Sequence, residues 1–244
     1  MPTIADLRAA TQPASIFERN SGEHWAGRLY MRRLSPYLTR LLLRTGISAN
    51  GVTWLMIVAG VAAAGVLALP GLLPAIGAAL LIQLQLLLDC SDGEVARWRG
   101  ERSTLGVYLD RIGHWLTEGA LPIALGIRAD DDASLVLGLV VAVLVLLIKA
   151  ESALVTVARA EAGLAPAADT VAVAAPRPGL LRHARRALGF VPFFRAFVAV
   201  EATLLALAAE ILDLTHELVV ALVVVTAITA AGHLLAIVTS ARLR

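Results

Sequence analysis

Residues 89–114 read DCSDGEVARWRGERSTLGVYLDRIGH, and this stretch decides how the rest of the chain is arranged. Its first half ends one long apolar run, its second half begins the next, and a short basic connection separates them. If both halves are helical, Asp89 and Asp92 lie one turn apart on one face, and Asp110 and His114 share a face of the next helix. At about 1.5 Å of rise per residue, Asp92 and Asp110 each lie about 9–11 Å from the connection. An antiparallel helical hairpin therefore brings the acidic side chains to one level.

The composition indicates an all-α integral membrane protein. Hydrophobic residues make up 58% of the 244 residues, and the mean hydropathy is +0.77, which is unusual for a water-soluble globule. The sequence contains neither a P-loop nor a GxGxxG pattern, so we expect no soluble nucleotide-binding domain. We also expect no nucleic-acid partner. Cys90 is the only cysteine, which excludes an intrachain disulfide and favours a small packing residue.

The carboxylates of the stretch point to a metal site. Carboxylates inside a membrane are costly, so they usually face a polar cavity, a partner or an ion. Asp89, Asp92 and Asp110 would repel one another unless cations lay between them. Oxygen ligands without paired cysteines favour a hard ion such as Mg²⁺ or Mn²⁺. Small residues beside the carboxylates leave room for a ligand near the backbone, at Gly93, Ala96 and Gly106.

The stretch resembles the signature of the CDP-alcohol phosphotransferases, also called CDP-alcohol phosphatidyltransferases. Their pattern is D-x-x-D-G-x-x-A-R, eight residues, G, three residues, D, three residues, D. The chain departs from this pattern only at the last position, where His114 replaces an aspartate. The matching positions are Asp89, Asp92, Gly93, Ala96, Arg97, Gly106 and Asp110.

The resemblance implies a six-helix membrane fold, a homodimer and displacement of CMP from a CDP-linked donor by an alcohol. It also implies two divalent cations, Mg²⁺ or Mn²⁺, held by Asp89, Asp92 and Asp110. The entrance of the first apolar run, SANGVT, is similar to the family's P-N-x-[VI]-T. Asn50 could touch the nucleotide there, or Ser48 and Asn50 could simply cap the helix. The residues expected to seat the CDP moiety are Asn50, Thr53, Asp89, Asp92, Gly93, Ala96, Arg97 and Gly106.

The departure at His114 bears on the mechanism. The resemblance implies that the family's final aspartate deprotonates the attacking hydroxyl. Histidine is a poor ligand for Mg²⁺ but a good general base, so we interpret His114 and Asp110 as the catalytic residues. Glu118, one turn further on, could hold the other ring nitrogen. Two alternatives remain open: His114 lines the acceptor pocket, or the chain is a relative that has lost activity.

Apolar periodicity predicts two domains. Residues 1–46 would be a cytosolic part, with an exposed lead-in over 1–24 and an amphipathic helix over 25–45 that lies on the membrane surface. An alternative is that this helix packs on other cytosolic elements. Residues 47–244 would be the catalytic domain. Its six expected membrane spans are 50–69, 72–97, 104–127, 133–159, 190–212 and 217–240.

Further charged residues are candidates for binding the acceptor. Lys149, the only lysine, lies about 15 Å inside its span, and an intramembrane lysine is a functional candidate. It could bind an acceptor phosphate or carboxylate, or pair with Glu118 or Glu151. Arg186 belongs to a basic cluster that could contact lipid headgroups or a phosphorylated substrate. The full set of acceptor-binding candidates is Glu118, Lys149, Arg186 and Arg195.

The distribution of arginines predicts the orientation. Nearly every positive charge lies before the first span, after the second and fourth spans, or at the C-terminus. The positive-inside rule then places both termini and the motif on the cytoplasmic side, where cytidine nucleotides are found. Because arginine almost replaces lysine and alanine is abundant, we expect a bacterial cytoplasmic membrane.

The function expected from these observations is metal-dependent transfer of a substituted phosphate group from a CDP-linked donor to a small polar or lipid alcohol. The reaction would release CMP and serve phospholipid or phosphodiester synthesis, with membrane lipids as neighbours. Two other functions remain: a non-catalytic homologue that acts as a binding partner, and a transporter that uses the buried carboxylates. The paired repeats typical of transporters are not evident in the sequence.

Overall fold

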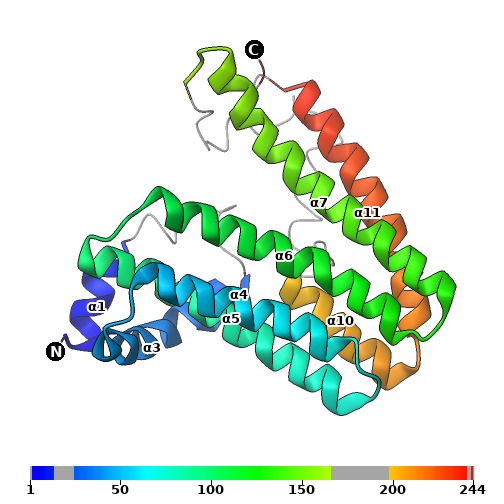
Figure 1. The fold of residues 1–244 in the computed structure, drawn as a ribbon, viewed down its shortest axis with the longest axis horizontal. Coiled ribbons are helices and arrows are strands. Elements are labelled where there is room, and N and C mark those ends of the chain that lie inside the picture. Colours follow the sequence, from blue (N-terminus) through cyan, green and yellow to red (C-terminus); the bar gives the residue numbers. More distant parts are fainter. Residues whose placement is uncertain (1, 14–24, 166–197, 241–242, 244) are drawn as a thin grey trace. The chain divides into compact units, whose positions relative to one another are not determined.

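A computed structural model describes residues 2–13, 25–165, 198–240 and 243. Every regular element in these residues is helical, and no strand occurs among them (Figure 1). The chain forms two compact units. The first comprises Met1–Leu67 and Leu73–Thr117, and the second comprises Ala68–Leu72 and Glu118–Arg244. The elements are α1 (Ile4–Thr11), η1 (Gly27–Met31), α3 (Arg32–Thr45), α4 (Ala49–Leu67), α5 (Leu72–Arg99), α6 (Thr104–Arg128), α7 (Asp132–Glu161), α10 (Ala199–Leu212) and α11 (Thr215–Val238).

Four helices in the described residues have the length and apolar composition needed to cross a membrane: α4, α5, α7 and α11. The bounds of these helices, and those of α6 and α10, can be compared with the six predicted spans. The ends of α4, α5, α6, α7 and α11 lie within two residues of the predicted ones. The predicted fifth span began at residue 190, and its residues 190–197 lie outside the described part of the chain. The membrane-protein assignment is confirmed, whereas the count of six spans stays a prediction.

The hairpin between α5 and α6 forms because its connection stops one helix and starts the next. Gly100 adopts a φ of +70°, a left-handed conformation that ends α5 and that glycine adopts without steric cost. Ser103 then caps α6, because its Oγ accepts a hydrogen bond of 2.9 Å from the backbone N–H of Gly106. The predicted helical hairpin is therefore present in the first unit.

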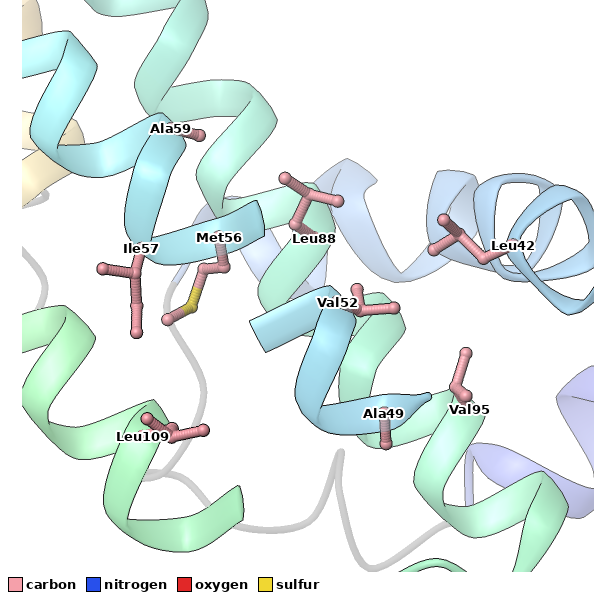
Figure 2. Packing of buried hydrophobic residues seen from close by; sticks show 9 residues of the cluster. All are labelled: Leu42, Ala49, Val52, Met56, Ile57, Ala59, Leu88, Val95 and Leu109. Carbon is pink, nitrogen blue, oxygen red and sulfur yellow. The ribbon is translucent and has the colours of Figure 1, made fainter. Parts of the chain in front are cut away.

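The apolar core of the first unit holds these helices in register. Side chains from α3, α4, α5 and α6 meet in one buried cluster (Figure 2). Burial of this apolar surface is the main favourable contribution to the packing of these helices. The members of the cluster are Leu42, Ala49, Val52, Met56, Ile57, Ala59, Leu88, Val95 and Leu109.

A glycine in α4 permits a polar contact between the two motif helices. Gln85 of α5 donates a hydrogen bond of 2.8 Å from Nε2 to Oγ1 of Thr117 on α6. A Cβ placed on Gly60 would lie 2.0 Å from that Oγ1 and 2.5 Å from that Nε2. Only a residue without a side chain allows α4 to approach the Gln85–Thr117 pair so closely, and this close packing fixes α5 against α6 beneath the motif.

The N-terminal residues differ from the prediction in two ways. Residues 1–24 were expected to form an exposed lead-in, but α1 forms there and its Leu7 and Thr11 are fully buried. The helix over 25–45 contains a π-helical turn, η1, before α3 begins at Arg32. The polar Ser35 and Thr39 of α3 are buried, whereas its apolar Tyr37 is 60% exposed. Most of the other residues in 2–13 are exposed, and residues 14–24 lie outside the described part of the chain, so the exposed lead-in stays a prediction.

In the second unit, Arg128, the last residue of α6, joins α6 to α10 and to the turn before α5. Its guanidinium pairs with Glu210 of α10, with 2.7 Å between Nη2 and Oε2, and it donates to the carbonyls of Leu69 and Gly71. The side chain of Arg128 is only 1% exposed, so its charge is stabilised by these partners. In the same unit, α7 and α11 pack along one another (Figure 1).

Candidate functional site

Three side chains of the hairpin meet in the first unit. Asp89 lies on α5, and Asp110 and His114 lie one turn apart on α6. The Nε2 atom of His114 is 3.1 Å from Oδ1 of Asp89 and 3.5 Å from Oδ1 of Asp110. One ligand atom from each of the three residues lies within 4.8 Å of the other two. The hairpin geometry predicted from helical spacing therefore brings these three residues together.

The donor set of this cluster fits a divalent cation. Its two carboxylates would repel each other, and a cation between them would offset that repulsion. Carboxylate oxygens suit Mg²⁺ and Mn²⁺, while an imidazole nitrogen suits the later transition metals better than Mg²⁺. The side chains are 24%, 44% and 34% exposed for Asp89, Asp110 and His114, so substrate and ions can reach them.

Asp92, the third predicted carboxylate ligand, does not belong to the compact group of three. Thr53 of α4 donates a hydrogen bond of 2.7 Å from Oγ1 to Oδ2 of Asp92. The same hydroxyl lies 3.2 Å from the carbonyl of Ala49. Thr53, expected to touch the nucleotide, thus orients Asp92 from the neighbouring helix. This contact depends on how α4 packs against α5, so no motif in the sequence reveals it.

The guanidinium of Arg97 lies over Gly93 of the motif. Its Nη1 and Nη2 would be 3.1 and 3.2 Å from a Cβ on Gly93. Its Nε donates to the backbone carbonyl of Thr11 at 2.6 Å. Ala96, also predicted to border the nucleotide, is half-buried and packs against the core cluster of the first unit.

Asn50 and Gly106 lie side by side across α4 and α6. A Cβ on Gly106 would be 2.8 Å from Oδ1 of Asn50, and Oγ of Ser103 is 3.4 Å from the same oxygen. The cap of α4 is provided by Ser48, whose Oγ accepts from the N–H of Gly51 at 3.1 Å. Asn50 is therefore inside the helix and directed toward the motif, which leaves its side chain available for a role in the site.

The predicted acceptor residues lie in the second unit or outside the described residues. Lys149 pairs with Glu118, with 2.8 Å between Nζ and Oε2, which is one of the two alternatives that the sequence left open. Glu151 pairs with His233 at 2.7 Å. Arg186 and Arg195 lie outside the described part of the chain.

Glu94 is a residue that the sequence reasoning missed. It occupies a position that the motif leaves variable, between Gly93 and Arg97, yet its side chain is fully buried and accepts three hydrogen bonds. The sequence could have pointed to Glu94, because this acidic residue lies in the same helical row as apolar positions that are buried. Buried carboxylates are rare unless they are paired, so such a position predicts a partner.

Comparison with known proteins gives a match to one family. The family model of the CDP-alcohol phosphatidyltransferases matches residues 46–229, about three quarters of the chain. The matched range contains every residue of the cluster and of the motif. A comparison with curated proteins found no match.

Proposed function

Because the chain belongs to the CDP-alcohol phosphatidyltransferase family and is therefore a membrane-bound transferase of phospholipid synthesis, we propose that it moves a substituted phosphate group from a CDP-linked donor to an alcohol, with release of CMP. The cluster of Asp89, Asp110 and His114 carries this proposal. Its ligand atoms lie within 4.8 Å of one another at the place where the family signature stands.

We propose that Asp89 and Asp110, assisted by Asp92, hold Mg²⁺ or Mn²⁺, with two ions as the working number. Bound cations would neutralise the pyrophosphate of the donor and stabilise CMP as a leaving group. Thr53 contributes by orienting the carboxylate of Asp92. Because His114 lies 3.1 Å from Asp89, an ion that tolerates imidazole, such as Mn²⁺, should support activity at least as well as Mg²⁺.

The nucleotide would lie over Gly93, Ala96 and Gly106, where little side chain separates a ligand from the backbone. Arg97 presents a guanidinium to the phosphates, since its planar donors match phosphate oxygens. Asn50 borders the same surface from α4. These assignments support a site that binds the CDP moiety, which all CDP-linked donors share.

The proton transfer is assigned to His114. The imidazole takes the proton of the acceptor hydroxyl while the hydroxyl oxygen forms a bond to the phosphorus that carries the donor's alcohol. The bond between that phosphorus and the CMP oxygen breaks, and CMP leaves with the electron pair. Asp110 shares this cluster and would hold the imidazole through the 3.5 Å contact.

Other features complete the proposal. The charge pattern supports an orientation with both termini and the site facing the cytoplasm of a bacterium. Six spans and a homodimer agree with the family. The chain would also have an N-terminal surface helix. The exposed apolar Tyr37, Leu34 and Leu41 of α3 support contact with a membrane surface. The acceptor would contact Glu118, Lys149, Arg186 and Arg195, the first two as an ion pair that a charged acceptor could enter.

The test is identification of products by mass spectrometry after the purified chain is incubated in vesicles with CDP-diacylglycerol, CDP-choline, CDP-ethanolamine or a CDP-linked polyol and a panel of alcohols. CMP release with formation of a matching phosphodiester supports the proposal. No CMP release from any donor, with or without divalent cations, would favour a non-catalytic relative or a transporter.

A further inference from the structure

The carboxylate of Glu94 is the centre of a buried polar network in the first unit. Its exposed fraction is 0%. Oε1 accepts from Nε2 of Gln12 at 2.8 Å and from Oγ of Ser35 at 2.5 Å, and Oε2 accepts from Oγ1 of Thr39 at 2.7 Å. The guanidinium of Arg32 lies 4.0 Å from Oε1. A buried carboxylate is tolerated when it is hydrogen-bonded in this way.

All these partners come from the N-terminal part of the chain. Gln12 follows the last residue of α1, and the remaining partners belong to α3. Glu94 itself follows Gly93 directly and lies three residues, nearly one helical turn, before Arg97. The network therefore joins α1 and α3 to the segment of α5 that carries the family motif, although the family match begins only at residue 46.

Arg97 is connected to the same end of α1. Its Nε donates to the carbonyl of Thr11 at 2.6 Å, and Thr11 is fully buried. The guanidinium is thereby held over Gly93. Within the described residues, its Nη2 is buried and has no hydrogen-bond partner. A buried guanidinium donor of this kind is well suited to a phosphate oxygen.

We propose that Glu94 and the Thr11–Gln12 end of α1 form a positioning unit that fixes the Arg97 guanidinium over Gly93 for the pyrophosphate of the CDP donor. This inference rests on the proposed function. Residues 2–12 then belong to the donor site although they lie outside the family match. Arg97 touches the phosphates, whereas Gln12 and Glu94 act through it and are positioning residues.

A pair of glutamine variants tests this role in the full chain, purified in detergent. Gln12→Ala removes the donor to Glu94. Gln83→Ala is the matched control, because Gln83 of α5 accepts a hydrogen bond of 2.6 Å from Tyr30 and so also joins the N-terminal part to α5. We expect Gln12→Ala to weaken CDP binding about tenfold, the loss typical of a hydrogen bond to a charged group. Gln83→Ala should change the Kd for CDP less than twofold.

Thermal unfolding of both variants separates positioning from folding. If the network were merely structural, both variants would lower the Tm and neither would change the Kd for CDP selectively. The inference is overturned if the Kd is unchanged in Gln12→Ala or changes equally in both. Glu94→Gln, which keeps the shape of the side chain, is expected to weaken CDP binding in the same direction as Gln12→Ala.

A double-mutant cycle tests the route through Arg97. Arg97→Ala alone should weaken CDP binding, and adding Gln12→Ala to it should cause little further loss, because coupled residues are non-additive. Fully additive losses would refute the route. The two proposals fail differently: a wild-type chain that binds no CDP counts against the proposed function, while one that binds CDP but is indifferent to Gln12 counts against this inference alone.

Discussion

The Nε2 atom of His114 lies 3.1 Å from Oδ1 of Asp89. This contact joins the first carboxylate of the motif on α5 to the position on α6 where the chain departs from the family pattern. Because the imidazole also lies 3.5 Å from Asp110, it occupies the centre of the cluster rather than its edge. A side chain at this place can exchange a proton with a bound hydroxyl or contribute to cation binding.

Replacement of His114 separates these roles. We expect His114→Ala to slow CMP release at least a hundredfold, the usual contribution of a general base, while the Kd for CDP stays within about threefold of wild type. His114→Asp, which restores the family's residue, should recover part of the lost rate. The rate of CMP release is measured at saturating donor concentration in a discontinuous assay. Near-wild-type turnover by His114→Ala would remove the assignment as base.

Gly106→Ala tests the part of the donor site that Gly106 and Asn50 form together. The added Cβ would be 2.8 Å from Oδ1 of Asn50, a flexible side chain, so the fold should survive while the carboxamide moves. We expect the donor KM to rise about threefold to tenfold with little change in Tm. Gly65→Ala on α4 is the control, since nothing lies within 4 Å of its Cβ position; helix propensity predicts a neutral or slightly stabilising change. Unchanged donor KM in Gly106→Ala would exclude Gly106 and Asn50 from the site.

Arg128→Met tests how much the buried contacts of Arg128 stabilise the second unit. The change leaves Glu210 and the carbonyls of Leu69 and Gly71 without the buried guanidinium, and loss of one partner of such a pair costs about 3 kcal/mol. Reversible unfolding in mixed detergent should show this loss. Arg111→Met, at an exposed position of α6, should change the free energy of unfolding by less than about 0.5 kcal/mol. Equal losses in the two variants would contradict the role of Arg128.

Long apolar runs made the membrane helices predictable. The limits of α4 and α5 follow from Ser48, Gly71 and Gly100, whose capping and turn preferences are local properties of the chain. Helical spacing was likewise enough to bring Asp89, Asp110 and His114 together, since it requires only that both arms be helical and antiparallel.

Contacts between distant helices were not predictable in the same way. The network around Glu94 depends on residues about eighty positions apart, such as Gln12 and Glu94. The hydrogen bond from Thr53 to Asp92 likewise joins α4 to α5, two helices whose packing the sequence does not specify. A single sequence carries the periodicity of each helix but not the rotation of one helix about another, and that rotation decides which polar side chains meet.

The central claim is that the carboxylates of the α5–α6 hairpin hold divalent cations for transfer from a CDP-linked donor. The most direct measurement is CMP release by the wild-type chain and by Asp110→Asn in vesicles, titrated with Mg²⁺ and Mn²⁺ after chelation. We predict release by the wild-type chain that is abolished by chelation and restored by either cation, and no release by Asp110→Asn at any cation concentration. Release that persists in the chelator, or an Asp110→Asn variant as active as wild type, would contradict the account.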